Sequence, residues 1–278
     1  MLPPKLDKCN KCHYNILVRR KRKGRRWFSF QSPWIDTAQR GLEKKGFTLI
    51  SVLDHGYIKL VNNMGSDIDV VNSARVSYDK EVSSLGEKDE SLINFLVKHR
   101  HDSTLRHCAM TFEVYAPLMV ARQWYKHAVG SSHLDDQLGW NESSRRYITE
   151  KEEFYIPHTD EWRSAPENSK QGSGEPLPRD VGAKHLQRLR ASVNRGIHDY
   201  EDALKDGVAP EQARLLLPAY AMYVRWRWTA SLNAVLHFVS LRTGHGAQSE
   251  IVDYANAVND YVLQYYPMTA KAWNEHRT

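Results

Sequence analysis

The sequence has little of what marks a secreted, membrane-spanning or disulfide-stabilised protein. Its 278 residues include only three cysteines, too few for a disulfide framework, which favours a reducing compartment. No apolar run reaches the roughly 18 residues that a membrane-spanning helix needs. The first residues also lack the long apolar segment of a secretory signal. We therefore expect a cytoplasmic protein with no membrane contact.

Glycine-rich phosphate loops and metal-ligand sets are missing as well. Neither G-x-G-x-x-G after a strand nor G-x-x-x-x-G-K-S/T occurs, so a nucleotide would have to be bound by side-chain cations and hydroxyls. Cys9, Cys12 and His13 form C-x-x-C-H, but no second Cys/His pair lies nearby to complete a zinc site, and a c-type haem site would need a secretory context. We expect unliganded thiols there and no metal. Cys108, just before a predicted strand, is expected to be a buried structural thiol rather than a nucleophile.

Positive charge is concentrated near the N-terminus. The formal net charge is +6, and seven arginines and lysines lie within residues 19–26, so the rest of the chain is close to neutral. Such a run is typical of a solvated tail, and contact with nucleic acid or another polyanion and a localisation signal are the alternatives. Residues 1–46 are therefore expected to form a basic N-terminal extension to a domain of residues 47–278.

The order of the predicted elements favours an α+β fold rather than a regular βαβ alternation. Two short strands split by Asp54-His55-Gly56 are expected within 47–65, and residues 162–180, rich in Pro, Ser and Gly, are expected to form a surface loop. Alternation and helical periodicity then predict further strands at 110–116 and 223–229, and helices at 67–77, 90–100, 117–128, 182–206, 209–218, 230–242 and 247–266.

The segment 141–147, "NESSRRY", carries groups that suit phosphate oxygens. Two hydroxyls and two planar guanidinium groups follow one another, at Ser143, Ser144, Arg145 and Arg146. Glu142 beside them would pair with an arginine or accept from a sugar hydroxyl or a ring N–H. The alternative is a helix N-terminus capped by Asn141 or Ser143, with the arginines on a solvated face.

Cations and hydroxyls recur in three other segments. In the predicted helix 117–128, Arg122 and Lys126 share one face, which suits a common anion or, alternatively, a surface stripe. Asp102-Ser103-Thr104 is either a ligand-binding turn or a capped loop. Arg214 and Arg242 each lie at the edge of an apolar helix, where an arginine usually extends to solvent or pairs with a carboxylate.

Taken in order, these segments resemble the flavin-dependent thymidylate synthase family over roughly residues 47–275. The resemblance rests on six stretches: "DHGYIKLVNNMGSDIDVVNSARVSYD", "LVKHRHDSTLRHCAMTFEVYAPLMVARQWYKH", "NESSRRY", "FYIP", "ARLLLP" and "LRTGHGAQSEIVDYANAV". It implies an α+β homotetramer with a mixed sheet, flanking helices and sites at subunit interfaces. It also implies reductive methylation of dUMP at C5, with FAD, NADPH and methylenetetrahydrofolate. The cofactor would do the hard chemistry, which fits the lack of a cysteine nucleophile.

The resemblance also assigns roles by position. Arg242 is the expected catalytic residue, because the family uses an arginine there to polarise the pyrimidine ring. Substrate-binding positions are expected at Gln123, Trp124, Tyr125, Lys126, Glu142, Ser143, Ser144, Arg145, Arg146, Arg214 and Arg242. Flavin-binding positions are expected at Ser103, Lys126, His127, Ala128, Glu142, Ser231, Leu232, Asn233 and His237.

Three features depart from the family pattern. Lys126-His127-Ala128 stands where the family has Arg-His-Arg, about eight extra residues precede "NESSRRY", and Gly246 replaces a histidine. The extra residues, with their glycine, serines and aspartates, are expected to form a flap over the pocket. Alternative functions are methylation of UMP, transfer of another one-carbon unit to a pyrimidine nucleotide, and non-enzymatic nucleic-acid binding through the basic extension.

Overall fold

The computed structural model describes residues 49–127, 139–143, 152–167 and 171–277. The basic segment 19–26, the C-x-x-C-H motif and most of the expected flap lie outside these ranges. The proposed boundary between an extension and a domain near residue 46 therefore stays a prediction. Within the described ranges, no helix is long and apolar enough to cross a membrane.

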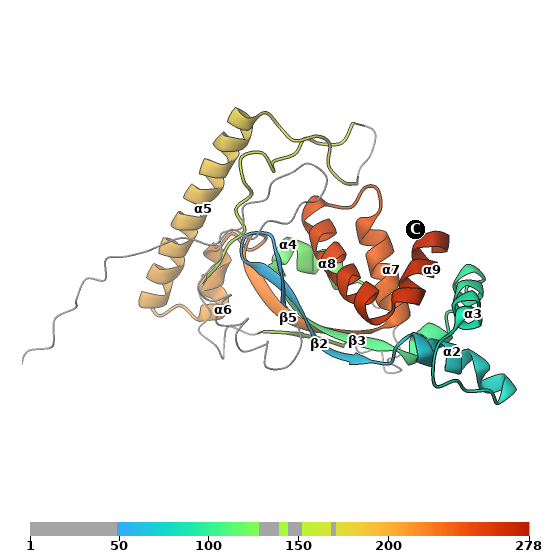
Figure 1. Ribbon diagram of the computed structural model, residues 1–278. Coiled ribbons are helices and arrows are strands. Elements are labelled where there is room, and N and C mark those ends of the chain that lie inside the picture. The colour runs from blue at the N-terminus through green and yellow to red at the C-terminus, as the bar shows by residue number, and fades with distance from the viewer. Residues whose placement is uncertain (1–48, 128–138, 144–151, 168–170, 278) are drawn as a thin grey trace, which may run out of the picture.

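A five-stranded antiparallel sheet forms the centre of the fold (Figure 1). Its order is β1 (Leu49–Val52), β2 (Gly56–Met64), β3 (Ala109–Pro117), β5 (Tyr223–Ser231) and β4 (Gly139–Glu142). Every pairing between these strands is antiparallel. The α+β class is confirmed, whereas the expectation of a mixed sheet is wrong, because β3 pairs directly with β5 and no parallel crossover is made.

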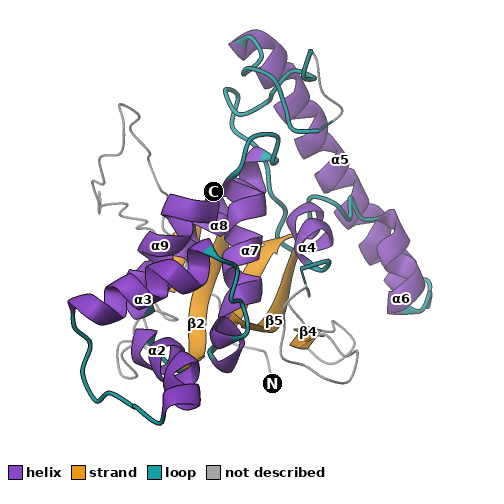
Figure 2. Cartoon of the chain, turned by 90° about the vertical axis from the view of Figure 1, so that its right-hand side faces the viewer, coloured by secondary structure: helices purple, strands orange, loops and turns teal. Residues whose placement is uncertain are grey.

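Helices cover one face of this sheet (Figures 1 and 2). The covering layer consists of α7 (Leu232–Thr243), α8 (Ser249–Tyr265) and α9 (Pro267–Arg277), whereas α5 stands apart from it in both views. The remaining helical elements are α2 (Asp67–Arg75), η2 (Val76–Tyr78), α3 (Glu87–Lys98), η3 (Thr104–His107), α4 (Leu118–Trp124), α5 (Arg179–Lys205), α6 (Pro210–Ala213) and η4 (Arg214–Leu216).

Alternation along the strands explains why only one face is covered by these helices. On β3, Met110, Phe112 and Val114 are fully buried, and the residues between them are half-buried. The buried residues meet Trp226 and Trp228 of β5, and Phe112 and Trp228 stack with ring centroids 6.0 Å apart. Burial of such large apolar side chains is the main term that stabilises the layer.

Two buried polar contacts fix α8 on the sheet and α9 on the start of α2. Tyr254 of α8 donates from its hydroxyl to the carbonyl of Tyr115, 2.8 Å away. A Cβ at Gly56 would stand 1.8 Å from that hydroxyl oxygen, so only glycine fits there. Asp67, which is 3% exposed, accepts from the amides of Met268 and Thr269 at the start of α9. The Asp67 bonds join segments some 200 residues apart, and the Tyr254 bond joins segments 139 residues apart.

Most of the predicted elements are present, with three differences. The helix predicted at 117–128 ends at Trp124, so Lys126 and His127 lie beyond it rather than one turn along its faces. Asn141 and Glu142 belong to strand β4, which rules out Asn141 as a helix N-cap, whereas the alternative with Ser143 as the cap concerns residues outside the described ranges. The helix α9 was not predicted. Cys108 is buried, as expected, and burial raises the pKa of its thiol to about 12.

Candidate active site

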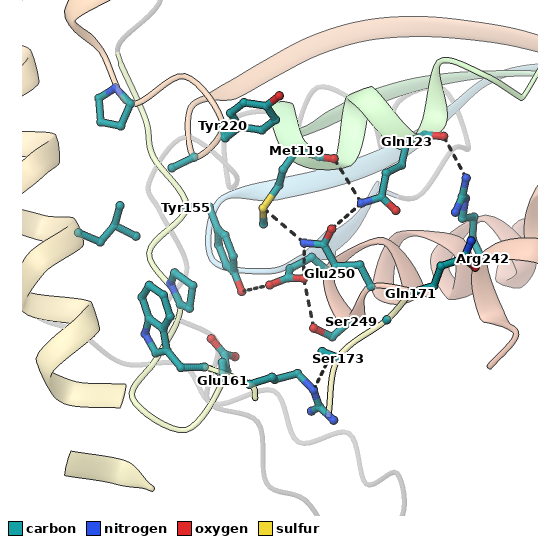
Figure 3. Close-up of a pocket in the computed structure, with 18 of the residues that line it drawn as sticks. Met119, Gln123, Tyr155, Glu161, Gln171, Ser173, Tyr220, Arg242, Ser249 and Glu250 are labelled. Atoms are coloured by element: carbon teal, nitrogen blue, oxygen red, sulfur yellow. Dashed lines mark hydrogen bonds between the residues drawn. The ribbon is translucent and has the colours of Figure 1, made fainter. Parts of the chain in front are cut away.

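A cavity of about 880 Å³ opens between α4, the start of α8, the end of α7 and two loops (Figure 3). This volume is in the range of small-molecule sites. Apolar and aromatic side chains form much of its wall, with polar groups on α4 and α8 and on the loop that carries Glu161, Gln171 and Ser173 (Figure 3). The lining residues are Met119, Gln123, Tyr155, Pro157, Glu161, Trp162, Arg163, Gln171, Gly172, Ser173, Leu189, Pro218, Ala219, Tyr220, Ala221, Arg242, Gly246, Gln248, Ser249 and Glu250.

Arg242 is held at one end of the cavity by two residues of the α4 segment. Its Nε donates to Nε2 of His127 over 2.9 Å, and its Nη2 donates to the carbonyl of Gln123 over 3.4 Å. Arg242 is in the last turn of α7, where a cation also interacts favourably with the helix dipole. The guanidinium group therefore has a fixed direction before any ligand is bound.

His127 can serve as an acceptor because it is neutral. Burial lowers the pKa of its imidazole to about 4, and the positive charge of Arg242 and the nearby His237 act in the same direction. A neutral imidazole with an unprotonated Nε2 accepts from Arg242, and its other nitrogen then carries the proton. The ring also packs edge-on against Phe238, with centroids 5.0 Å apart.

A chain of hydrogen bonds runs from Gln123 to Glu250 along the polar wall (Figure 3). The side-chain Nε2 of Gln123 donates to Oε1 of Gln248. The Nε2 of Gln248 donates to Glu250 over 2.8 Å. Glu250 also accepts from the hydroxyl of Ser249 over 3.2 Å and from that of Tyr155 over 3.5 Å.

A second cluster of charges lies on β4 and η4. Burial raises the pKa of the Glu142 carboxyl, while the positive charges of Arg214 and Arg122 act in the opposite direction. Arg214 itself is exposed, and its Nε donates to the carbonyl of Glu211 over 3.3 Å. Glu142, Arg214 and Arg122 are thus close enough for their charges to interact. The chain continues directly from η4 to Pro218 and Tyr220 of the cavity wall.

The predicted surface loop 162–180 forms part of the cavity instead of lying free. We call residues 162–167 and 171–177 the cavity strap. Its two arms are joined by backbone hydrogen bonds, from Ser164 to Glu175 and from Leu177 to Trp162. One arm presses its backbone onto the loop after α7, so that a Cβ at Gly172 would stand 2.9 Å from Cα of Gly246. The backbone at Gly246 is therefore in close contact with the protein's own strap.

The expected site residues fall into several groups. Gln123, His127 and Arg242 converge at the cavity, and Glu142 interacts with Arg214. Tyr125 packs edge-on against Trp140 of β4, and Lys126 lies 6.0 Å from the Tyr125 ring centroid. Ser103 and Ser143 are not among the residues that line the cavity. The structure does not describe Ala128, Ser144, Arg145 or Arg146.

Two of the expected binding residues have side chains that lie in the core. The Trp124 ring is fully buried and stacks on Phe238 at 4.2 Å, so it contacts the core rather than a substrate. Leu232 is also fully buried and cannot present its side chain to a cofactor. Its neighbour Ser231 accepts from the amide of Ala234 and thereby caps α7.

On the same helix, Asn233 and His237 are one turn apart. His237 lies 6.5 Å from His127, measured between ring centroids. The side-chain oxygen of Asn233 is buried and has no hydrogen-bond partner among the described residues. A buried acceptor without a partner is costly, which marks this oxygen as a group that a ligand can satisfy.

Several lining residues were not expected from the sequence. Tyr155, Gln248 and Glu250 lie in the stretches "FYIP" and "GAQSE", on which the resemblance partly rests, but no motif assigned them a role. Trp162 and Tyr220 carried no signal beyond being aromatic residues near prolines. Their position in the cavity depends on how distant segments pack, which local sequence does not specify.

Comparison with known proteins first identifies the architecture. The chain is similar to the solved UMP/dUMP methylase PolB from Streptomyces cacaoi bound with 5-Br dUMP. The TM-score is 0.70 and the identity 28%, over 82% of this chain and 99% of that one. The structure of the same methylase with 5-Br UMP gives a TM-score of 0.68, at 27% identity over 82% of this chain and 97% of that one.

Sequence comparison then gives the family. Residues 59–268 match the family model described as "Thymidylate synthase complementing protein". A flavin-dependent thymidylate synthase of Anaplasma marginale is 37% identical over 227 residues, which are 82% of this chain and 75% of that relative. One from Thermosipho africanus is 36% identical, over 80% of this chain and 92% of the relative. The chain belongs to the flavin-dependent thymidylate synthase family.

Proposed function

We propose that this protein methylates C5 of the uracil ring of dUMP to form dTMP, using a bound flavin. The observation that carries the proposal is the pre-oriented Arg242, held by His127 and Gln123 at the wall of a nucleotide-sized cavity. C5 of uracil is a weak carbon nucleophile. A fixed guanidinium beside the ring oxygens stabilises the negative charge that develops there when C5 attacks an electrophile.

The described residues fit a flavin at the start of α7. The unpartnered oxygen of Asn233 can accept from a ring N–H, and His237 lies one turn further along the same helix. Ser103, Lys126 and Glu142 are further contacts that the family resemblance implies. A flavin bound there would supply hydride to the reaction, and the protein's part is to orient it and exclude water.

The remaining reactants follow from the electron balance. Methylenetetrahydrofolate carries its one-carbon unit at the level of formaldehyde, so conversion to a methyl group requires two further electrons. We take NADPH as their source, by resemblance to the family. The aromatic and apolar wall with Tyr155, Trp162 and Tyr220 offers faces on which a planar ring can stack.

The proposal includes self-association, by resemblance a homotetramer. Leu215 is 82% exposed and Tyr220 68% exposed, next to the cavity wall. Apolar side chains that are this exposed near a site are typical of surfaces buried on assembly. Light scattering of the purified protein should then give about four times the mass of the chain, 32.2 kDa, and a monomer at micromolar concentration would contradict this part.

Tritium release from dUMP labelled at C5 tests the main reaction. The purified protein is loaded with FAD and its visible spectrum recorded with and without dUMP. Tritium release and dTMP formation are then measured with methylenetetrahydrofolate and NADPH, with each reactant omitted in turn. A protein that takes up no flavin, or that releases no tritium with all reactants present, would contradict the proposal.

A second candidate function is the same methylation at C5, with UMP instead of dUMP as the substrate. The similar structure from Streptomyces cacaoi is described as a UMP/dUMP methylase and was solved with 5-Br UMP as well as 5-Br dUMP. Equal or faster tritium release from labelled UMP than from dUMP would favour this candidate over the first.

A further inference from the structure

The hydrogen bonds along the polar wall of the cavity fix the orientation of two side-chain amides, those of Gln123 and Gln248. Both N–H groups of the Gln248 amide are used, one by Glu250 at 2.8 Å and one by the sulfur of Met119 at 3.5 Å. Both N–H groups of the Gln123 amide are used as well, one by Gln248 and one by the carbonyl of Met119 at 3.5 Å. Each amide therefore points its nitrogen away from the cavity end that Arg242 occupies.

Glu250 sets this direction because a carboxylate has acceptor atoms only. It obliges Gln248 to turn its nitrogen toward Glu250 and its oxygen toward Gln123. Gln123 must then turn its nitrogen toward Gln248. Reversing Gln123 alone would bring its oxygen against two other oxygens, those of Gln248 and the Met119 carbonyl. Facing lone pairs make that arrangement unfavourable.

Among the described residues, the side-chain oxygen of Gln123 is consequently left as the free group of this amide. Figure 3 shows it directed away from Met119 and Gln248, on the side where Arg242 lies. In the described part of the chain, this cavity end thus places the acceptor of Gln123 beside the donors of Arg242. Uracil presents a donor at N3 flanked by acceptors at O2 and O4. Cytosine presents an acceptor at N3 and a donor at N4.

We propose that Glu250, acting through Gln248, is the positioning residue that makes this cavity select uracil over cytosine nucleotides. The inference rests on the proposed function, since it takes a pyrimidine nucleotide as the ligand beside Arg242. With the amide chain in this direction, the Gln123 oxygen accepts from N3–H of uracil. The same oxygen faces a lone pair at N3 of cytosine, which leaves two buried acceptors unpaired.

The test is the ratio of dissociation constants for dCMP and dUMP, measured by calorimetry on the FAD-loaded full-length protein. The key variant is Glu250→Gln, which keeps the size but adds a donor, so that Gln248 can reverse. A reversed Gln123 then faces one opposing oxygen, the Met119 carbonyl, in place of two and can present its nitrogen to the cavity. We expect the ratio to fall by about tenfold or more, with weaker dUMP binding and unchanged or tighter dCMP binding.

Glu161→Gln is the matched control, because Glu161 lines the same cavity and is outside the amide chain. It removes the same charge and should leave the ratio within about twofold of the wild-type value. Gln248→Leu is a second way to interrupt the chain and should lower the ratio as Glu250→Gln does. Thermal unfolding checks that each variant is folded.

The outcomes separate the inference from the function on which it rests. A wild-type protein that binds dUMP and shows the same ratio as both Glu250→Gln and Gln248→Leu would overturn the inference and leave the proposed function standing. Equal falls in Glu250→Gln and Glu161→Gln would also overturn it, because charge rather than direction would then be responsible. A wild-type protein that binds no pyrimidine nucleotide would overturn both.

Discussion

Arg242 and Arg214 are the two described arginines expected to face the nucleotide, and the structure holds them in opposite ways. Arg242 is half-buried and bonded to His127 and Gln123, which come from a segment 115 to 119 positions away in the sequence. Arg214 is exposed, and its described hydrogen bond goes to the carbonyl of Glu211 in its own turn. One arginine is fixed by the fold, and the other is free to move with a ligand.

The difference indicates which part of the reaction each arginine serves. Stabilising charge in a transition state requires donors that are already in place, because reorganisation would consume the benefit. Binding a phosphate tolerates an adjustable cation, since the group is charged in both the ground and transition states and contributes uniform binding. We expect Arg242 to act on turnover and Arg214 on affinity.

The largest effect should come from Arg242→Ala. We expect kcat to fall by about 100-fold or more, because removing one donor of this kind typically costs that much. Flavin absorbance should be retained. Arg242→Lys should recover little, because an ammonium group is a point charge that cannot bond His127 and the ring oxygens in one plane. Arg242→Ala and Arg214→Ala with identical kinetic effects would contradict the division between the two arginines.

The contact between His127 and Arg242, which fixes Arg242, can be tested by changing the pH. Its folded-state pKa of about 4 lies below the ordinary value of 6.5. Between these pH values the unfolded chain binds a proton that the folded protein does not, so stability is lost as pH falls from 6.5 to 4. The shift corresponds to about 3 kcal/mol of the free energy of unfolding.

Denaturant unfolding at pH 7 and pH 4 measures this loss. His127→Gln keeps an acceptor for Arg242 but does not titrate, so it should lose about 3 kcal/mol less than the wild type between the two pH values. His198→Gln is the control, because the His198 side chain is 72% exposed on α5. An acid sensitivity in His127→Gln equal to that of the wild type would show that His127 is not held neutral by its surroundings.

Elements with a regular local pattern could be predicted from the sequence, whereas elements that depend on distant contacts could not. The alternating strand at 223–229 and the helices that became α7 and α8 were predicted, because their patterns are local and regular. Helix α9 was not predicted, and its start is stabilised by Asp67, a residue from the other end of the domain. Strand β4 was missed because its pairing partner, β5, lies some 85 residues away.

The residues of the site could also be predicted from the sequence only in part. Arg242 and Gln123 were expected from the family resemblance, and the structure brings them together. The importance of Gln248 and Glu250 appears only in the packed structure, since a glutamine has no preferred direction until its neighbours supply donors or acceptors. The motif did not indicate that the Trp124 ring lies in the core, because a tryptophan inside a binding motif looks the same whether it faces a ligand or the core.

Arg214→Ala should have a smaller effect that falls on affinity. We expect the KM for dUMP to rise by about tenfold with kcat changed by less than about threefold, as loss of uniform binding predicts. Arg195→Ala is the control, because the Arg195 side chain is 85% exposed on α5 and pairs with Asp199. If Arg214→Ala lowers kcat and leaves KM unchanged, Arg214 acts on turnover, as Arg242 does, and not on affinity.

The smallest effect is expected from Gly172→Ala, which tests the contact between the cavity strap and the loop after α7. Gly172 has φ of +79°, and an added Cβ would stand 2.9 Å from Cα and 3.1 Å from the carbonyl oxygen of Gly246. Neither partner is a flexible side chain, so the strap arm must shift outward. We expect the KM for dUMP to rise by a few-fold, with kcat nearly unchanged because Arg242 keeps its contacts.

Gly207→Ala separates the steric effect from backbone strain. Gly207 has φ of +84°, close to that of Gly172, but nothing lies within 4 Å of a Cβ placed there. Both variants should lose about 1 kcal/mol of stability from the left-handed conformation, and only Gly172→Ala should change KM. If the two variants unfold alike and share wild-type kinetics, the strap does not bound the nucleotide site, and its contact with Gly246 serves the fold alone.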